Sequence, residues 1–213
     1  MANILVFGDS VAYGRWDKES GWVNKLRNFV DKKYTRQNWW LKETFTVYNL
    51  GVAGETAETL LEHFEVETKP RAWEGGKLII IFQLGTNDSA VKYPGGNARF
   101  TPNEFQKNLI KLVSLAKKFT NVIIFLGLTR VDEKRVNPVP WDKELSYKNT
   151  SISEFNNIIK SVCNEKNLDY VNLRKTSQAK VDTLLFDGIH PNTEGHKKIF
   201  EIVRDFLVEH KII

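Results

Sequence analysis

Five runs of apolar residues alternate along the chain with segments in which apolar positions recur every three or four residues. The runs are strand-like and cover residues 3–8, 44–49, 77–84, 121–128 and, more weakly, 168–173. The intervening stripes have helical spacing and predict helices, with 55–68 as a less regular fifth candidate. The four regular stripes are Trp22/Val23/Leu26/Phe29/Val30, Phe105/Leu109/Leu112/Val113/Ala116, Ile152/Phe155/Ile158/Ile159/Val162 and Ile199/Ile202/Val203/Phe206.

The third and fourth runs are apolar at almost every position, which is typical of strands buried on both faces of a parallel sheet. Five strands that alternate with five helices predict an α/β fold, a three-layer α/β/α sandwich around a five-stranded parallel sheet. We find no repeat, low-complexity segment or linker, so we expect one domain over residues 1–213.

Two helix starts carry a capping signature. Thr101-Pro102-Asn103-Glu104 combines a capping box with proline at the first helical position. The segment Ser151-Ile152-Ser153-Glu154 repeats the pattern. We therefore expect helices to begin directly after Thr101 and Ser151.

The composition is that of an ordinary globular protein, with 41% hydrophobic and 27% charged residues among 213. No apolar run approaches the length of a membrane span. The start of the chain lacks a basic segment followed by an apolar core, so we expect no signal peptide and a cytoplasmic location.

The net charge of +5 raises the possibility of nucleic-acid binding. Its lysine pairs, 32–33, 117–118 and 197–198, are dispersed over several helical segments, which favours solvated surface over a nucleic-acid site. The single cysteine, Cys163, excludes an internal disulfide and lies in an amphipathic segment, so we expect a buried structural thiol.

Polar residues and glycines directly follow the predicted strands. In open parallel sheets, ligands bind outside the carboxyl ends of the strands. Those ends are Gly8-Asp9-Ser10, Asn49-Leu50-Gly51, Gly85-Thr86-Asn87-Asp88 and Thr129-Arg130. Residues that are distant in the sequence are thus expected to converge at one edge of the sheet.

Ser10 follows the end of the first predicted strand, a position suited to a nucleophile, but a serine hydroxyl needs a base to accept its proton. Histidine is the usual base. His63 and His210 lie in helical segments rich in Glu and Lys, and His196 lies on the polar side of the last predicted helix. We expect these three at the surface, which leaves His190.

His190 lies in the segment FDGIHPN, between the last strand and the last helix. Asp187 precedes it by three residues, and Gly188 allows a tight bend. An aspartate at this spacing can accept the imidazole Nδ1–H and leave Nε2 for a serine. A turn that caps a helix explains the motif equally well on its own, but Ser10 at a strand end favours catalysis.

A serine hydrolase also needs donors for the oxyanion of a tetrahedral intermediate. Gly51 offers a backbone N–H that a substrate can approach closely, and Asn87 offers a side-chain amide. Each has a structural alternative, a strand-to-helix turn for Gly51 and an Asx turn or cap for Asn87. Together, the four polar motifs supply the parts of one mechanism.

The sequence resembles the GDSL, or SGNH, hydrolase family, whose four motif blocks carry Ser, Gly, Asn and His in that order. The matching positions are Gly8-Asp9-Ser10, Asn49-x-Gly51-x-x-Gly54, Gly85-x-Asn87-Asp88 and Asp187-x-x-His190, which span nearly the whole chain. Val11 stands where the family name has leucine. The resemblance implies a flavodoxin-like sheet and hydrolysis of esters or thioesters. Asp9 and Asp88 are interpreted as structural residues that hold their turns.

Position by position, the resemblance makes Ser10 the nucleophile, His190 the base and Asp187 the group that orients the histidine. The oxyanion donors are then the backbone N–H groups of Ser10 and Gly51 and the side chain of Asn87.

Other classes fit less well. An α/β-hydrolase elbow needs G-x-S-x-G, and position 12 is alanine. Neither the dinucleotide fingerprint G-x-G-x-x-G nor an H-E-x-x-H or Cys/His cluster is present, so we expect no cofactor and no metal. The alternative from another class is a catalytically silent binding module that kept the fold.

Two long connections, 89–101 and 131–149, border the predicted site and are expected to carry specificity. Trp16, Tyr93 and Trp141 are candidates for an aromatic pocket wall, although packing of its own loop is a slightly favoured role for Trp141. The expected partner is a small-molecule ester with a short acyl group. Thioesters, lysophospholipids and acetylated carbohydrates remain open, and oligomeric state is not indicated.

Overall fold

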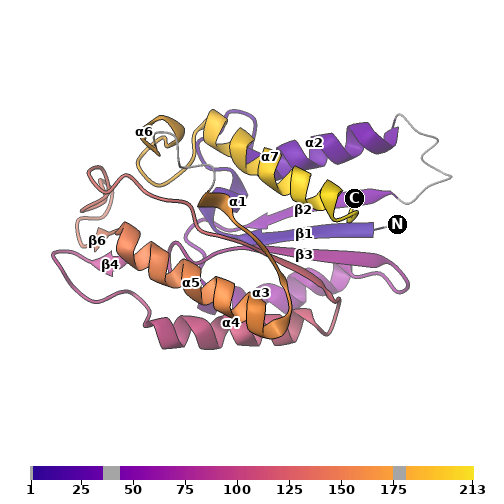
Figure 1. Cartoon of the computed structure of the whole chain (residues 1–213), viewed down its shortest axis with the longest axis horizontal. Helices are drawn as coiled ribbons and strands as arrows, with labels where there is room; N and C mark the ends of the chain where they lie inside the picture. The colour runs from indigo at the N-terminus through magenta and orange to yellow at the C-terminus, as the bar shows by residue number, and fades with distance from the viewer. Residues whose placement is uncertain (1, 36–43, 175–180) are drawn as a thin grey trace.

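A five-stranded parallel sheet forms the centre of the molecule, with strand order β2-β1-β3-β5-β7 (Figure 1). The structure is a computed structural model that describes residues 2–35, 44–174 and 181–213. The strands are β1 (Ala2–Gly8), β2 (Phe45–Gly51), β3 (Lys77–Gln83), β5 (Val122–Leu126) and β7 (Asp169–Val171). All five predicted strands are confirmed. The strand with the weakest apolar pattern in the sequence, β7, is the shortest.

The register of the sheet brings three strand ends to one edge. Gly8 at the end of β1 lies opposite Gly51 on β2 and Gln83 on β3. The loops that follow these strands therefore start side by side. This edge is the one at which the sequence predicts the site.

Helices cover both faces of the sheet (Figure 1). On one face lie α2 (Gly21–Thr35), α7 (Thr193–Glu209) and the short α1 (Ser10–Tyr13), and on the other lie α3 (Ala57–Thr68), α4 (Pro102–Ala116) and α5 (Asn149–Lys166). Alternate residues of each strand feed the two cores: Leu5 and Phe7 pack under α3 and α4, and Ile4 and Val6 under α2 and α7. The three-layer α/β/α sandwich is confirmed.

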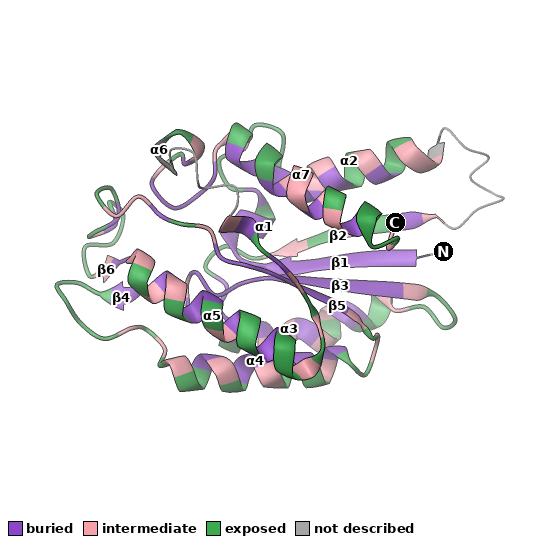
Figure 2. Cartoon of the chain, in the orientation of Figure 1, coloured by how far each residue is buried: buried purple, intermediate pink, exposed green. Residues whose placement is uncertain are grey.

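The central strands are buried along almost their whole length, while the helices alternate buried and exposed positions (Figure 2). This burial explains why β1 and β3 are continuous apolar runs in the sequence, whereas the helices have apolar residues at every third or fourth position. Trp22 is wholly buried under the sheet, where its indole N–H donates to Gln83 Oε1 at 2.7 Å. Burial of each large apolar side chain contributes about 1.5–3 kcal/mol.

One of the two predicted helix starts is confirmed. Thr101 caps α4 with a complete capping box, in which its hydroxyl accepts from Glu104 N and the Glu104 carboxylate accepts from Thr101 N. The prediction for Ser151 is wrong, because α5 begins three residues earlier, directly after Lys148. The Ser151 hydroxyl instead donates to the backbone carbonyl of Ser89 at 2.7 Å, which ties α5 to the loop after β3.

Short elements that the apolar pattern did not predict shape the rim of the sheet. The strands β4 (Val91–Lys92) and β6 (Leu145–Ser146) pair antiparallel and join the two long connections, 89–101 and 131–149. A turn of 3₁₀ helix, η2 (Lys69–Arg71), follows α3, and α6 (Val181–Leu184) precedes the turn that contains His190.

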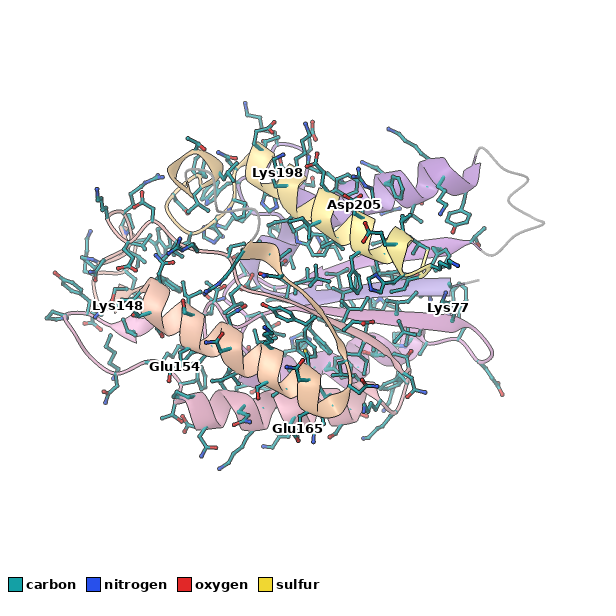
Figure 3. The ribbon with its side chains drawn as sticks, viewed as in Figure 1. Lys77, Lys148, Glu154, Glu165, Lys198 and Asp205 are labelled. Carbon is teal, nitrogen blue, oxygen red and sulfur yellow. The ribbon has the colours of Figure 1, made fainter. Side chains whose placement is uncertain are left out.

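Charged side chains of both signs lie on the outer faces of the helices (Figure 3). Glu154 and Glu165 on α5 and Lys198 and Asp205 on α7 are all exposed. Cys163 is fully buried, as predicted, and burial raises the pKa of its thiol to about 12. Among the helices of the described ranges, none has the length and apolar character needed to cross a membrane.

Candidate active site

The turn from β1 into α1 places Ser10 at the carboxyl edge of the sheet. Gly8 has no room for a side chain, because a Cβ there would lie 2.2 Å from the carbonyl oxygen of Gln83. Asp9 caps α1, and its carboxylate accepts from Val11 N at 2.9 Å. Ser10 follows as the first residue of α1 and is 7% exposed. Asp9 thus holds its turn, as the sequence predicts.

A second tight turn presents His190. Asp187 Oδ1 accepts from the backbone N–H groups of Ile189 (3.1 Å) and His190 (2.9 Å), so the aspartate folds back over its own turn. Gly188 has a φ of +100°, a conformation that side chains other than glycine rarely adopt. The turn is closed by a hydrogen bond from Phe186 N to the carbonyl of His190 at 2.8 Å.

The two turns meet in a continuous hydrogen-bonded chain. Ser10 Oγ lies 2.8 Å from His190 Nε2, and His190 Nδ1 lies 2.7 Å from Asp187 Oδ2. Partial burial raises the pKa of Asp187, but hydrogen bonds from the side chain and backbone of His190 outweigh it and hold this pKa at about 2. Asp187 is therefore a carboxylate at neutral pH, and as such it can only accept from Nδ1. In the tautomer that carries its hydrogen on Nδ1, Nε2 is placed to accept from Ser10.

Asn87 lies across the pocket from this chain, in the loop after β3. Its Oδ1 accepts from the hydroxyl of Tyr147 at 3.0 Å, and its Nδ2 donates to the backbone carbonyl of Glu55 at 3.0 Å. These two contacts define the orientation of the amide. Asn87 lines the cavity, and its Nδ2 carries a second N–H besides the one that donates to Glu55.

The structure corrects the position expected for Gly51. Its N–H donates to Asn49 Oδ1 at 3.0 Å, and a Cβ at Gly51 would lie 2.4 Å from Tyr13 N. Gly51 therefore serves the close packing of β2 on α1 and is not part of the pocket wall. Gly54, three residues later, lines the pocket with a φ of +85° and open space at its Cβ position.

A cavity of about 120 Å³ lies between these groups. It is lined by Asp9, Ser10, Val11, Arg15, Trp16, Ala53, Gly54, Thr86, Asn87, Trp141, Tyr147, Asp187, Ile189 and His190. Two of the strand ends named from the sequence, 8–10 and 85–88, contribute, together with the loop after β2 and the turn before α7. The structure thus brings Ser10, Asn87, Asp187 and His190 together, as the sequence predicts.

The three aromatic residues predicted to form the pocket wall do not all lie at the cavity. Trp16 and Trp141 line the cavity, whereas Tyr93 lines a different surface depression with Lys92, Arg99 and Glu144. Tyr93 is held there by a backbone hydrogen bond from its N–H to the carbonyl of Glu144 at 2.8 Å. Tyr93 is therefore not part of the wall of this cavity.

Trp141 does not pack its own loop down. Its side chain is 56% exposed, and its ring centroid lies 6.0 Å from that of His190. The loop is anchored instead by Val136 and Val139, both fully buried. The packing role favoured from the sequence is wrong, and Trp141 stands at the mouth of the cavity.

His196 is fully buried, which corrects its expected place at the surface. Its Nε2 donates to the carbonyl of Arg15 at 3.3 Å, and burial lowers the pKa of its imidazole. The sequence contains a signal for this burial, because His196 precedes Ile199 by three residues and Val203 by seven. This spacing places all three on one helix face. His210 is exposed as predicted, and His63 is half-buried beside the carboxylate of Glu55 at 2.8 Å.

Two buried acids flank the site. Burial raises the pKa of Asp9 to about 6 and that of Asp88 to about 7. Asp88 Oδ1 accepts from Ala57 N at 2.9 Å and so ties the start of α3 to the loop after β3. Tyr147, which the sequence placed only in a specificity loop, is the residue whose role was missed. No local signal connects it with Asn87, sixty residues earlier.

In the described ranges, no three His, Cys, Asp or Glu side chains are grouped so that they could hold a metal ion. Three side chains of the cavity form a hydrogen-bonded chain, from the hydroxyl of Ser10 through the imidazole of His190 to the carboxylate of Asp187.

Known proteins share this fold and sequence pattern. The chain is 25% identical, over 223 aligned residues, to a multidomain esterase from Ruminococcus flavefaciens. The alignment covers 92% of this chain and 27% of that protein, so the chain spans about a quarter of the length of this curated relative.

Two crystal structures share the fold over almost their whole length. A lipase/acylhydrolase from Enterococcus faecalis superposes with a TM-score of 0.76 at 20% identity, covering 97% of this chain and 95% of that one. An acetylxylan esterase from Geobacillus stearothermophilus superposes with a TM-score of 0.71 at 17% identity, covering 98% and 93%.

The family assignment rests on the sequence profile of the GDSL-like Lipase/Acylhydrolase family, which matches residues 6–198. The match includes every strand end that contributes to the cavity and ends within α7. The chain therefore belongs to the GDSL-like lipase/acylhydrolase family, a family of ester-cleaving hydrolases.

Proposed function

We propose that this protein is a serine esterase that cleaves short-acyl carboxylic esters through an acyl-serine intermediate. The observation that carries the proposal is the unbroken chain Ser10 Oγ to His190 Nε2 (2.8 Å) and His190 Nδ1 to Asp187 Oδ2 (2.7 Å). These contacts match the roles of nucleophile, base and orienting acid in a catalytic triad.

In the acylation step, Ser10 Oγ attacks the ester carbonyl while His190 Nε2 accepts the hydroxyl proton. The Asp187 carboxylate stabilises the imidazolium that forms, because it accepts the Nδ1–H. The protonated histidine then donates its Nε2 proton to the leaving alkoxide, so an alcohol departs and the acyl group stays on Ser10. In deacylation, His190 takes a proton from water, the hydroxide attacks the acyl carbonyl, and Ser10 regains its proton as the acid leaves.

Three donors are proposed for the oxyanion: the N–H of Ser10, the N–H of Gly54 and the free Nδ2–H of Asn87. The N–H of Ser10 is at the start of α1, and the first N–H groups of a helix lack an intrahelical acceptor. Gly54 takes the role expected for Gly51, because it lines the cavity and its N–H has no hydrogen-bond acceptor within the described ranges.

The size of the cavity supports a short acyl group. A buried cavity of ~150 Å³ accommodates benzene in another protein, and the cavity here is smaller, about 120 Å³. An acetyl or propionyl group fits this space beside the oxyanion, whereas the chain of a long fatty acid would have to lie over the exposed rim.

A carbohydrate is the leaving group that the rim favours, and the substrate is then an acetylated carbohydrate. Trp141 exposes 56% of its surface and Trp16 exposes 47%, both beside the reacting serine. Large exposed aromatic faces at a pocket mouth suit the apolar face of a sugar ring, while the cavity holds the acetyl group. The acetylxylan esterase with the same fold is consistent with this class of substrate.

The chemistry is tested by labelling with a serine-directed fluorophosphonate. The wild-type chain is expected to react at residue 10, and Ser10→Ala is expected to lose both labelling and esterase activity while keeping its melting temperature. Ser114→Ala, which removes an exposed hydroxyl on α4, serves as the matched control and should behave as wild type. Absence of labelling in the folded wild-type chain would favour a silent binding module.

Specificity is tested with p-nitrophenyl acetate, butyrate and octanoate, acetylated xylo-oligosaccharides, an acyl-CoA and a lysophospholipid. We expect kcat/KM to fall as the acyl chain lengthens. We also expect Trp141→Ala to lower kcat/KM more for the acetylated oligosaccharides than for p-nitrophenyl acetate. A preference for octanoate, for acyl-CoA or for the lysophospholipid would overturn the short-acyl assignment and indicate a lipase or thioesterase.

A further inference from the structure

The Asp187 carboxylate receives a hydrogen bond from a distant part of the chain. Three of its donors belong to its own turn: the backbone N–H groups of Ile189 and His190, and His190 Nδ1. The fourth is the indole N–H of Trp16, which donates to Asp187 Oδ2 at 2.9 Å from 171 positions earlier. Trp16 and His190 therefore share one carboxylate oxygen.

The backbone at Trp16 is in a conformation that bulky residues rarely adopt. Its φ is +66°, in the left-handed region, and such outliers persist only where the surroundings hold them. Asp17 provides part of that support, because its carboxylate accepts from Glu19 N at 3.2 Å and Gly21 N at 3.0 Å. The buried His196 provides further support, through its hydrogen bond to the carbonyl of Arg15.

Two side chains contact the indole ring of Trp16. Phe186, the residue before Asp187, stacks on it with ring centroids 5.1 Å apart and planes inclined by 24°. The Arg15 guanidinium lies 4.8 Å from its ring centroid. The side chain is nevertheless 47% exposed and lines the cavity. A substrate in the cavity would exclude water from the indole N–H and from the carboxylate oxygen that accepts it.

We propose that Trp16 is a positioning residue for the triad, which holds the Asp187 carboxylate toward His190 and moderates its charge through the indole N–H. The proposal rests on the triad of the proposed function. Because a hydrogen bond spreads the negative charge of a carboxylate, the donor from Trp16 weakens the hold of Asp187 on a protonated imidazole. It also restricts rotation of the carboxylate, which keeps Oδ2 in line with Nδ1.

The test is Trp16→Phe, which removes the donor and keeps an aromatic ring against Phe186. We expect kcat to fall by about tenfold, the scale of one hydrogen bond to a charged group, with a smaller change in KM. We also expect the acid limb of the pH–rate profile to move to higher pH. With one donor fewer, the carboxylate holds the imidazolium more strongly, and the neutral base forms only at higher pH.

The other titratable groups near the pair are unchanged in this variant. Asp9, Arg15 and Tyr147 line the same cavity. Arg135 donates to the carbonyl of Phe186, and His196 lies beneath the Trp16 loop. A displaced acid limb in Trp16→Phe is therefore attributable to the lost indole donor, because the variant alters none of these groups.

Two control variants separate the donor from the ring. Phe186→Leu removes the stacking partner but keeps the indole N–H, and its acid limb should stay in place. Trp73→Phe changes an exposed indole that precedes β3, at the other edge of the sheet, and should leave both kcat and the profile unchanged.

The outcomes distinguish this inference from the proposed function. If Ser10→Ala is inactive but Trp16→Phe keeps the wild-type kcat and acid limb, Trp16 is only a pocket wall and the inference is overturned. An effect of Trp16→Phe on KM alone would overturn the inference in the same way. If Ser10→Ala retains activity, the triad itself is wrong.

Discussion

The two sides of the cavity, which are the base side and the oxyanion side of the proposed mechanism, are built in different ways. On the base side, Asp187 and His190 belong to one four-residue turn, and the turn itself supplies three of the four donors to the carboxylate. On the oxyanion side, Asn87 is oriented by Tyr147 and by the carbonyl of Glu55, which come from two other segments. One side is local in the sequence and the other is assembled by the tertiary fold.

This difference predicts how each side responds to substitution. The base side works through a charge and a proton, so its variants should change the pH dependence of the reaction as well as its rate. The oxyanion side works through the position of neutral donors, so its variants should lower kcat at every pH. The variants below test this distinction in order of expected effect.

The largest effect is expected for Asp187→Asn. The asparagine Oδ1 can still accept from the backbone of the turn, but its Nδ2 cannot accept from imidazole Nδ1–H, so the histidine adopts the wrong tautomer. We expect kcat to fall on the order of 10⁴-fold with the fold intact, as followed by steady-state kinetics and thermal unfolding. Activity within tenfold of wild type would remove Asp187 from the triad.

Asn87→Ala should have the next largest effect. Loss of one oxyanion donor is expected to lower kcat by about 10²–10³-fold, with little change in KM and none in the shape of the pH profile. Asn157→Ala, an exposed asparagine on α5, is the control and should have wild-type kinetics. A loss of less than about threefold for Asn87→Ala would mean that the backbone donors alone hold the oxyanion.

Tyr147→Phe should have a smaller effect of the same kind. It frees the Oδ1 of Asn87 and lets the amide rotate, so we expect kcat to fall by about five- to tenfold with KM and the acid limb unchanged. Tyr170→Phe removes an equivalent hydrogen bond, from the Tyr170 hydroxyl to Asn156 Oδ1 at 2.9 Å, away from the cavity. It is therefore the matched control, and equal losses of kcat in both variants would argue against a positioning role for Tyr147.

The smallest effect on catalysis is expected for Asp88→Asn, whose readout is stability. Burial raises the pKa of Asp88 to about 7 in the folded chain, above its ordinary value of 3.8. The folded state thus retains a proton on Asp88 that the unfolded state releases, so the contribution of Asp88 to wild-type stability should fall as pH rises from about 4 to about 7.

The amide introduced by Asp88→Asn does not titrate, and it keeps an oxygen that can accept from Ala57 N. We expect this variant to reduce the loss of stability between pH 4 and pH 7 by about 1–3 kcal/mol, measured by thermal or urea unfolding at both pH values. Asp9, whose pKa burial raises to about 6, contributes in the same direction and should leave a residual slope. An unchanged slope would mean that Asp88 is ionised in the folded chain.

Much of the fold and the base side could be predicted from the sequence, because their signals are local. Continuous apolar runs identified β1, β3 and β5, helical stripes identified α2, α4, α5 and α7, and a less regular pattern over 55–68 indicated α3. The spacing of Asp187 and His190 specified a turn whose geometry depends on four consecutive residues. The parallel register then made it predictable that Ser10 and Asn87 lie at one edge.

Other features were decided only by the tertiary structure. Gly51 and Gly54 are equally plausible in the motif, and the choice between them depends on the hydrogen bond from Gly51 N to Asn49 and on packing against α1. The bond between Tyr147 and Asn87, the burial of His196 and the separation of Tyr93 from the cavity likewise depend on which segments meet.

The physical reason is that some features depend on residues close together in the sequence, whereas others depend on contacts between remote segments. Hydrophobic periodicity and turn chemistry act over a few residues, so the sequence by itself determined the strands of the central sheet, the long helices and the Asp187–His190 turn. The direction of an N–H group, or the partner of a buried hydroxyl, is set by atoms from remote segments. Only the packed chain therefore decided that Gly54 faces the cavity and that Trp16 bonds to Asp187.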